Sequence, residues 1–302
     1  MHLGNEFNGI VNVLKPPGMT SRGVVDKARR LFEIKRVGHA GTLDKGAAGV
    51  LLICLGKATR RFDILVERQK EYVAEITFGI CTDTQDSYGK ITKRIPHDVS
   101  FEGLKDALDD FIGRQYQKAP AYSSLKFEGK PFYELALRGE AVPERNREIW
   151  LHELELICQV DEDRYLLRIV CSRGTYIRTL CEDIGNRLGT CAHMSFLLRT
   201  SSGDYNICKA YAIPELVALK ETGSLNEAIT SIEDSTEFLP AVHINDELDY
   251  FRLKNGQTVL LNGDIPVEKT LTRVYLRHSF LGIGVIIGGG VKLKIHYLQN
   301  VK

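Results

Sequence analysis

The sequence predicts an α+β fold. Segments with strand and helix periodicity are mixed along the chain and do not alternate as regular β-α-β units. The 302 residues, with 43% hydrophobic and 26% charged side chains, suit one large or two globular domains. No apolar run approaches the length needed to span a membrane, and the start lacks a signal-peptide pattern. We therefore expect a cytoplasmic protein without membrane segments.

The first elements are a strand and a helix. Residues 10–14 are apolar except for Asn12 and precede a proline-glycine turn, which predicts a short strand. Thr20 or Ser21 can cap the helix that follows. Apolar side chains recur there at helical spacing, at Val24, Val25, Ala28, Leu31 and Phe32. The opposite face and the residues after it are basic, a pattern typical of either a solvated face or a phosphate contact: Lys27, Arg29, Arg30, Lys35 and Arg36.

The next elements are equally periodic. Residues 48–60 begin with an unbroken apolar run, typical of a strand buried on both faces. Residues 70–79 alternate as a half-buried strand does, with one side formed by Tyr72, Ala74, Ile76 and Phe78. Residues 100–113 predict a helix whose inward side chains are Leu104, Leu108, Phe111 and Ile112. Residues 165–189 predict a strand, a turn and a helix lined by Ile177, Leu180, Ile184 and Leu188.

Charge and glycine patterns mark the end of the chain as a separate unit. Eight acidic residues and no lysine or arginine lie in 221–249, whereas 250–302 holds eight lysines and arginines and two acids. Residues 281–298, LGIGVIIGGGVKLKIHYL, indicate a small β domain with a glycine-rich turn between strands. We predict one domain at 1–240 and a second at 241–302.

The cysteines indicate neither a disulfide framework nor a metal site. There are seven, an odd number, and none form a C-x-x-C pair: Cys54, Cys81, Cys158, Cys171, Cys181, Cys191 and Cys208. In a cytosolic chain this predicts reduced thiols that fill core space. Cys191 lies close to His193, but no second pair completes a zinc site, so we expect no metal.

One loop contains a candidate catalytic residue. RVGHAGTLDKGAAGVLLICLG, residues 36–56, places a single carboxylate, Asp44, among small residues directly before the buried strand. The spacing from Gly41 to Gly46 resembles a P-loop, but Ala47 stands where that motif needs lysine, which argues against a nucleotide triphosphate site. A carboxylate on such a turn is either a nucleophile at a sugar carbon or a turn residue bonded to its own backbone. A glycosidase would need a second acid, and no matching loop supplies one.

Four sequence blocks that follow one another in a fixed order decide between these two interpretations of Asp44. RVGHAGTLD…GVLLICLGKATR, KEYVAEITFGICTDTQDSYG, APAYSSLKFEGKPFYELALRG and CSRGTYIRTLCEDIG together resemble the TruB family, the bacterial tRNA pseudouridine-55 synthases. The resemblance runs from about residue 8 to about residue 205. More weakly, FRLKNGQTV and LGIGVI are similar to the family's C-terminal PUA-like RNA-binding domain. The resemblance implies a catalytic domain built around a mixed, mainly antiparallel sheet.

The resemblance also implies the catalytic group. Asp44 matches the essential carboxylate of the family's GHxGTLD block, and Arg178 of GTYIRTL matches the arginine that pairs with it. An adjacent guanidinium favours the ionised carboxylate. The reaction detaches uracil from its ribose and reattaches it through a ring carbon. Because this is an isomerisation, it implies no cofactor and no metal, and no leaving alcohol needs a second acid.

Further positions match residues that contact substrate in the family. Tyr72 matches the tyrosine that stacks on the target base, Tyr176 a second substrate-contacting tyrosine and Leu197 a leucine of the base pocket. His39 matches the histidine that is inserted near the extruded base, where it offsets part of the unstacking cost. From pattern alone, each of these side chains equally suits an ordinary core or loop position. We also expect Lys15 of KPPG to contact phosphates.

The sequence departs from the family next to the catalytic aspartate. Lys45 stands where proline is common, and GAAG replaces the more usual xATG. Either change loosens the loop or adds a phosphate contact.

The expected function is isomerisation of uridine 55 in the TΨC arm of tRNA, by a monomer without guide RNA. Two rivals remain, an RNA-folding chaperone that needs no catalysis and a guide-RNA-directed synthase. The sequence shows no extended basic tail, which disfavours the guide-RNA-directed synthase.

Overall fold

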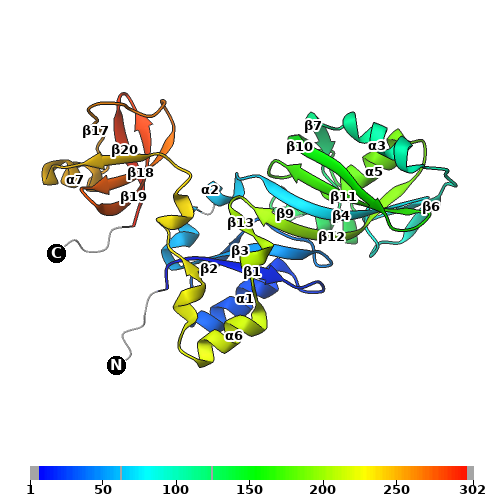
Figure 1. The fold of residues 1–302 in the computed structure, drawn as a ribbon, viewed down its shortest axis with the longest axis horizontal. Helices are drawn as coiled ribbons and strands as arrows, with labels where there is room; N and C mark the ends of the chain where they lie inside the picture. The colour runs from blue at the N-terminus through cyan, green and yellow to red at the C-terminus, as the bar shows by residue number, and fades with distance from the viewer. Residues whose placement is uncertain (1–6, 62, 124, 298–302) are drawn as a thin grey trace.

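The computed structural model describes residues 7–61, 63–123 and 125–297. Over these residues the chain forms one large mixed sheet with helices and a second, smaller sheet at the C-terminal end (Figure 1). The α+β class predicted from the periodicities is confirmed. None of the described helices is both long and apolar enough to cross a membrane.

The strands of the large sheet come from the whole length between residues 9 and 230. Its main path runs in the order β14-β1-β3-β12-β4-β11-β10-β7. Their bounds are β14 Tyr211–Ala212, β1 Gly9–Lys15, β3 Ala48–Leu55, β12 Ala192–Ser202, β4 Lys70–Phe78, β11 Arg164–Cys171, β10 Asn146–Gln159 and β7 Gly113–Lys118. Off this path, β13 Tyr205–Asn206 pairs with β12, β15 Ile229–Thr230 with β1, and β2 Val37–Ala40 with β3.

Parallel pairing in this sheet is restricted to two contacts among the described strands. β1 runs parallel to β14 and β12 runs parallel to β3, and the other pairs are antiparallel. The sheet is therefore mixed and mainly antiparallel, as the resemblance implies. Two short hairpins stand apart, β5 Ile80–Thr82 with β6 Ile91–Arg94, and β8 Lys126–Phe127 with β9 Lys130–Pro131.

β3 lies between two cores, which explains its unbroken apolar sequence. Leu51, Ile53 and Leu55 point into the main core, together with the inward residues of β4. Val50, Leu52 and Cys54 point to the other side, into a smaller core with Leu65. Because both faces of the strand are covered, neither set of alternate positions tolerates a polar side chain.

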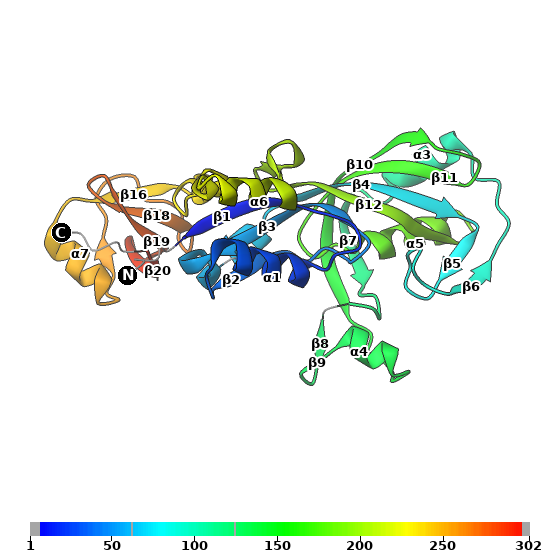
Figure 2. The ribbon, with the colours of Figure 1, turned by 90° about the horizontal axis from the view of Figure 1, so that it is seen from below.

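Helices cover the large sheet and extend from it. The longer ones are α1 Ser21–Phe32, α3 Phe101–Asp109, α5 Ile177–Arg187 and α6 Ile213–Glu221, and the short ones are α2 Asp63–Val66 and α4 Phe132–Leu137. Short 3-10 turns occupy Gly56–Arg61, Ile207–Lys209, Leu225–Ala228 and Asp234–Thr236. The Thr20 hydroxyl caps α1 by accepting from the Gly23 amide, as the sequence predicts. In Figure 2, α4 and the β8-β9 hairpin project away from the sheet.

The C-terminal residues build their own core. Five strands follow the order β16-β18-β19-β20-β17, with bounds β16 Ala241–Ile244, β18 Leu271–Leu276, β19 Ser279–Ile287, β20 Gly290–His296 and β17 Val259–Leu260. Helix α7, Glu247–Lys254, buries Leu253 against them. Gly288 and Gly289 form the β19-β20 turn with positive φ, so the predicted glycine-rich turn is confirmed. The curled sheet is PUA-like.

Three local expectations are wrong. Helix α3 ends at Asp109, so Ile112 lies beyond it and is exposed. Cys81 and Cys191 form a disulfide, with their Cα atoms 5.2 Å apart, because the pairing of distant strands brings them together. Of the remaining cysteines, Cys158 and Cys208 are exposed and do not fill the core, whereas the other three are buried.

Candidate active site

Asp44 lies in the loop between β2 and β3, at the edge of a cleft. Gly41 and Gly49 flank this loop with φ values of 93° and 114°. A Cβ on Gly49 would lie 2.2 Å from the Arg199 carbonyl oxygen, so the loop approaches β12 more closely than other residues allow. The Asp44 carbonyl accepts the Ala47 amide at 3.2 Å, which closes a tight turn. The small residues therefore bring this carboxylate close to the neighbouring strand.

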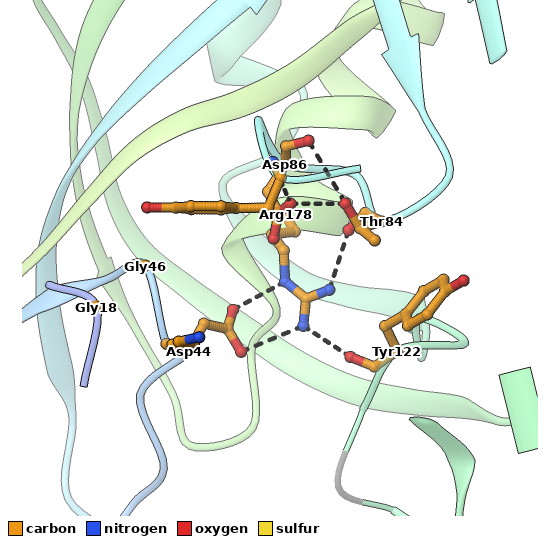
Figure 3. A pocket seen from close by; sticks show the side chains of 9 residues that line it. Gly18, Asp44, Gly46, Thr84, Asp86, Tyr122 and Arg178 are labelled. Atoms are coloured by element: carbon orange, nitrogen blue, oxygen red, sulfur yellow. Dashed lines mark hydrogen bonds and ion pairs between the residues drawn. The ribbon is translucent and has the colours of Figure 1, made fainter. Parts of the chain in front are cut away.

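Arg178, in the first turn of α5, holds the carboxylate from the other side of the cleft. Its Nε donates to Asp44 Oδ2 at 2.8 Å and its Nη2 to Oδ1 at 3.4 Å. The other donations go to backbone, from Nη1 to the Thr84 carbonyl and from Nη2 to the Tyr122 carbonyl, both at 3.0 Å (Figure 3). The Arg178 side chain is 5% exposed and that of Asp44 is 42% exposed. The ion pair thus has a fixed cation and a carboxylate that solvent or substrate can reach.

The start of α5 is itself positioned by a buried glutamine. Gln117 on β7 accepts the Tyr176 amide at 2.7 Å and donates to the Tyr176 carbonyl at 2.9 Å. Gln117 is 2% exposed. Tyr176 is the N-terminal cap residue of α5, and the Arg147 guanidinium lies over its ring at 5.7 Å. These contacts set the position from which Arg178 reaches Asp44.

A cleft of about 360 Å³ opens over the ion pair. Figure 3 shows Gly18 and Gly46 on one side of the pair and Tyr122 on the other. The full lining is Gly18, Asp44, Lys45, Gly46, Thr84, Asp86, Tyr88, Tyr122 and Arg178. Of the six site residues expected from sequence, Asp44 and Arg178 line the cleft. The polar and aromatic residues from 84 to 122 were missed, although they belong to the TDTQDSYG and AYSSLK segments of the family-like blocks.

Two buried cations support the Asp44 loop from behind. Lys15 is 0% exposed, and its Nζ donates to the carbonyls of Ala47 at 2.6 Å, Pro16 at 2.9 Å and Lys45 at 3.3 Å. Burial lowers its pKa from 10.5 to about 8, against the opposing influence of Asp44. The expected phosphate contact is therefore wrong for Lys15, because the ammonium is enclosed by loop carbonyls.

Arg199 on β12 is the second of these cations and is 1% exposed. Its Nε donates to the Val50 carbonyl at 2.7 Å and its Nη2 to the Gly41 carbonyl at 3.1 Å. The Gly41 carbonyl lies at the start of the loop that carries Asp44, and the Val50 carbonyl lies in β3, just after the loop. Arg199 therefore holds the backbone at the start of the loop and just after it, and Lys15 holds the turn between these points.

The remaining expected residues lie near this support and do not line the cleft. Tyr72 on β4 is 8% exposed, and burial raises its pKa, while the hydrogen bond with Arg199 acts in the opposite direction. Burial lowers the pKa of His39 on β2 and favours the neutral ring. Its Nδ1 is buried and has no hydrogen-bond partner within the part of the chain that the structure describes. Leu197 is a core residue of β12.

Comparison with known proteins decides the family. A model described as the TruB family pseudouridylate synthase N-terminal domain matches residues 29–177, and one for the tRNA pseudouridylate synthase B C-terminal domain matches residues 178–236. The chain belongs to the TruB family. The chain is 40% identical over 291 residues to tRNA pseudouridine synthase B of Caldanaerobacter subterraneus subsp. tengcongensis, covering 95% of this chain and 98% of the relative. The enzyme of the same name from Pelotomaculum thermopropionicum is 46% identical over 78% of this chain and 76% of its own.

Solved structures share the fold of this TruB-family chain. A chain of a Cbf5-Nop10-Gar1 complex superposes with a TM-score of 0.72 at 25% identity, covering 96% of this chain and 85% of that one. A chain of an H/ACA RNP bound to a substrate RNA containing 2'-deoxyuridine gives a TM-score of 0.73 at 24% identity, with the same coverage. The second likeness concerns the fold alone.

The loop of this TruB-family chain remains anchored at the position where its sequence departs from the family. The Lys45 side chain is exposed, but its carbonyl accepts the Gly18 amide at 2.8 Å as well as the Lys15 ammonium. The backbone at Lys45 is therefore held without proline. Lys45 itself lines the cleft.

Proposed function

We propose that the chain isomerises uridine to pseudouridine at position 55 in the TΨC loop of tRNA, with Asp44 as the catalytic carboxylate. One observation carries the proposal most directly: Asp44 is half-exposed in a cleft, and the buried Arg178 holds it in a bidentate pair. Membership of the TruB family and the names of the relatives support the reaction and the tRNA substrate.

The geometry suits chemistry at a ribose carbon. The N1–C1′ bond of the uridine breaks, a C5–C1′ bond forms, and the C5 proton is replaced by one on N1, so no atom is gained or lost. Arg178 fixes the orientation of the Asp44 carboxylate in the cleft through two hydrogen bonds. Lys15 and Arg199 hold the backbone of the loop, so the carboxylate meets the sugar without reorganisation of the loop.

The remaining site residues have proposed roles beside the cleft. Tyr72 lies within electrostatic reach of Asp44. In this proposal it stacks on the target base and takes part in proton transfer. Leu197 and Tyr176 border the base pocket once RNA is bound. The neutral ring of His39 fills space near the extruded base, which costs a few kcal/mol to unstack. Because Tyr72 and Leu197 are buried, these roles require the cleft to widen when the RNA enters.

RNA recognition in this proposal is divided between two domains, 1–240 and 241–302. Lys27, Arg30, Lys35 and Arg36 are exposed on or after α1, and Lys292 and Lys294 are exposed on β20. Such cations supply sequence-independent affinity for phosphates, while the folded T-arm supplies shape. The protein acts as a cytoplasmic monomer on bare tRNA, without guide RNA.

The test uses an unmodified tRNA transcript with wild-type protein and Asp44→Asn, without guide RNA. Pseudouridine is mapped by carbodiimide labelling and primer-extension stops. Asp26→Asn is the matched control, because the Asp26 side chain is 43% exposed and also paired with an arginine, Arg29. We expect a stop at the T-loop uridine with wild type and with Asp26→Asn, and none with Asp44→Asn. Tight tRNA binding by all three proteins without any stop would refute the proposal and favour an RNA-binding role.

A further inference from the structure

Tyr88 is an exposed aromatic side chain at the mouth of the Asp44 cleft. It lies in the loop between β5 and β6, lines the cleft, and is 76% exposed. Isolated exposed apolar side chains are common on proteins, so exposure alone indicates nothing. Its contact with the catalytic loop distinguishes it from other surface tyrosines.

The ring of Tyr88 occupies the space beside Gly46, two residues after Asp44. A Cβ built on Gly46 would lie 2.1 Å from Cε2 of Tyr88, 2.7 Å from Cζ and 2.8 Å from the hydroxyl oxygen. Gly46 is not among the glycines with positive φ, so its backbone does not itself require glycine. The absent side chain at 46 therefore serves the approach of the Tyr88 ring.

The loop that carries Tyr88 is held in place independently of this contact. The Asp86 carboxylate accepts the Tyr88 amide at 3.0 Å and the Thr84 hydroxyl at 2.6 Å. The Asp86 carbonyl accepts the Thr82 hydroxyl at 2.7 Å, and Asp86 forms a β-bridge with Met194 of β12. The Thr84 carbonyl accepts Arg178, so the same loop contacts the guanidinium that holds Asp44.

These contacts fix the backbone that carries the Tyr88 ring, and the ring lines the same cleft as Asp44. Its far edge rests on Gly46 and most of its surface faces solvent. RNA-binding sites use such rings as platforms for unpaired bases, because every base has a π-face that stacks on an aromatic side chain. Tyr72, the tyrosine expected to contact the target base, is buried and offers no free face at the cleft mouth.

We propose that Tyr88 is a base-binding residue, on which a nucleobase of the substrate RNA stacks at the mouth of the Asp44 cleft, and that Gly46 is the small residue which makes room for its ring. This inference rests on the proposed function, because it assigns Tyr88 a role in binding the same RNA. It predicts that the ring contributes to capture of the RNA and not to the chemical step at Asp44.

The experiment measures single-turnover pseudouridine formation on the tRNA transcript over a range of enzyme concentrations. We expect Tyr88→Ala to raise the half-saturating concentration about tenfold, the scale that loss of one base–aromatic stack produces, and to leave the saturated rate within about threefold. Tyr88→Phe keeps the stacking surface and should behave like wild type. Tyr116→Ala is the control, since Tyr116 is 68% exposed on β7 and does not line the cleft.

A double-mutant cycle with Gly46 tests the contact itself. Gly46→Ala displaces the Tyr88 ring and should also raise half-saturation, whereas in the Tyr88→Ala background the same change should have no further effect. A loss confined to the saturated rate in Tyr88→Ala, or unchanged half-saturation in that variant, would overturn the stacking proposal. An inactive wild type would instead refute the proposed function, so the two failures are distinguishable.

Discussion

Replacement of Arg199 by methionine tests how the catalytic loop is held. The guanidinium is 1% exposed and donates to the carbonyls of Val50 and Gly41 at 2.7 Å and 3.1 Å. Methionine keeps a side chain of similar length but donates no hydrogen bond. The substitution therefore leaves two carbonyls without this partner, that of Gly41 at the start of the loop that carries Asp44 and that of Val50 in β3, just after the loop.

The size of the effect follows from these two bonds. Each hydrogen bond from a charged donor contributes about 1.5–3 kcal/mol, so loss of both costs about 3–6 kcal/mol. Arg199 forms no ion pair with a carboxylate among the residues that the structure describes, so removal of its buried charge recovers part of this cost. We expect a net loss of roughly 2–4 kcal/mol, which lowers the melting temperature by about 3–6 °C for a chain of 302 residues.

The activity of Arg199→Met should fall because the loop shifts. A displacement of about 1 Å at a reacting group can cost a factor of about 100 in rate, so we expect a 10- to 100-fold lower saturated rate. The assay combines thermal unfolding with single-turnover pseudouridine formation well below both melting temperatures. Arg114→Met, at an exposed arginine paired with Glu148, should leave both readouts unchanged. A wild-type saturated rate in Arg199→Met would show that this guanidinium does not position the loop.

Three further predictions concern buried or paired groups. Burial lowers the pKa of Lys15 to about 8, so its charge destabilises the folded state below about pH 8 and this cost fades toward higher pH. Urea midpoints should therefore shift in favour of wild type over Lys15→Met from about pH 7 to about pH 10; a constant difference would contradict this. Thiol titration in denaturant should count five thiols before reduction and seven after it; seven at the outset would mean that Cys81 and Cys191 are not linked. Gln117→Leu should cost about 1–3 kcal/mol in urea unfolding, because the amide at the start of α5 loses its buried partner, whereas Gln115→Leu should cost less, because Gln115 is only partly buried and its amide makes an exposed hydrogen bond.

Much of the fold was predictable because it depends on local periodicity. The alternation of 70–79 and the unbroken apolar run after Gly49 predicted β4 and β3, and Thr20 predicted the start of α1. The end of α3 was misjudged, because apolar residues just after a helix continue its pattern without continuing its hydrogen bonds. Nothing in the spacing of Cys81 and Cys191 indicated their pairing, since strand pairing brings together positions 110 residues apart.

By itself, the sequence determined the secondary structure of the main elements, the family and the identity of the Asp44 and Arg178 pair. Only the tertiary structure decided what surrounds that pair. Lys15 looked like a phosphate contact and is instead enclosed by the carbonyls of Lys45 and Ala47. The sequence also does not reveal that the Tyr88 ring approaches Gly46. The physical reason is that burial and the direction of backbone carbonyls depend on segments distant in the chain, whereas periodicity records only the face that each residue shares with its neighbours.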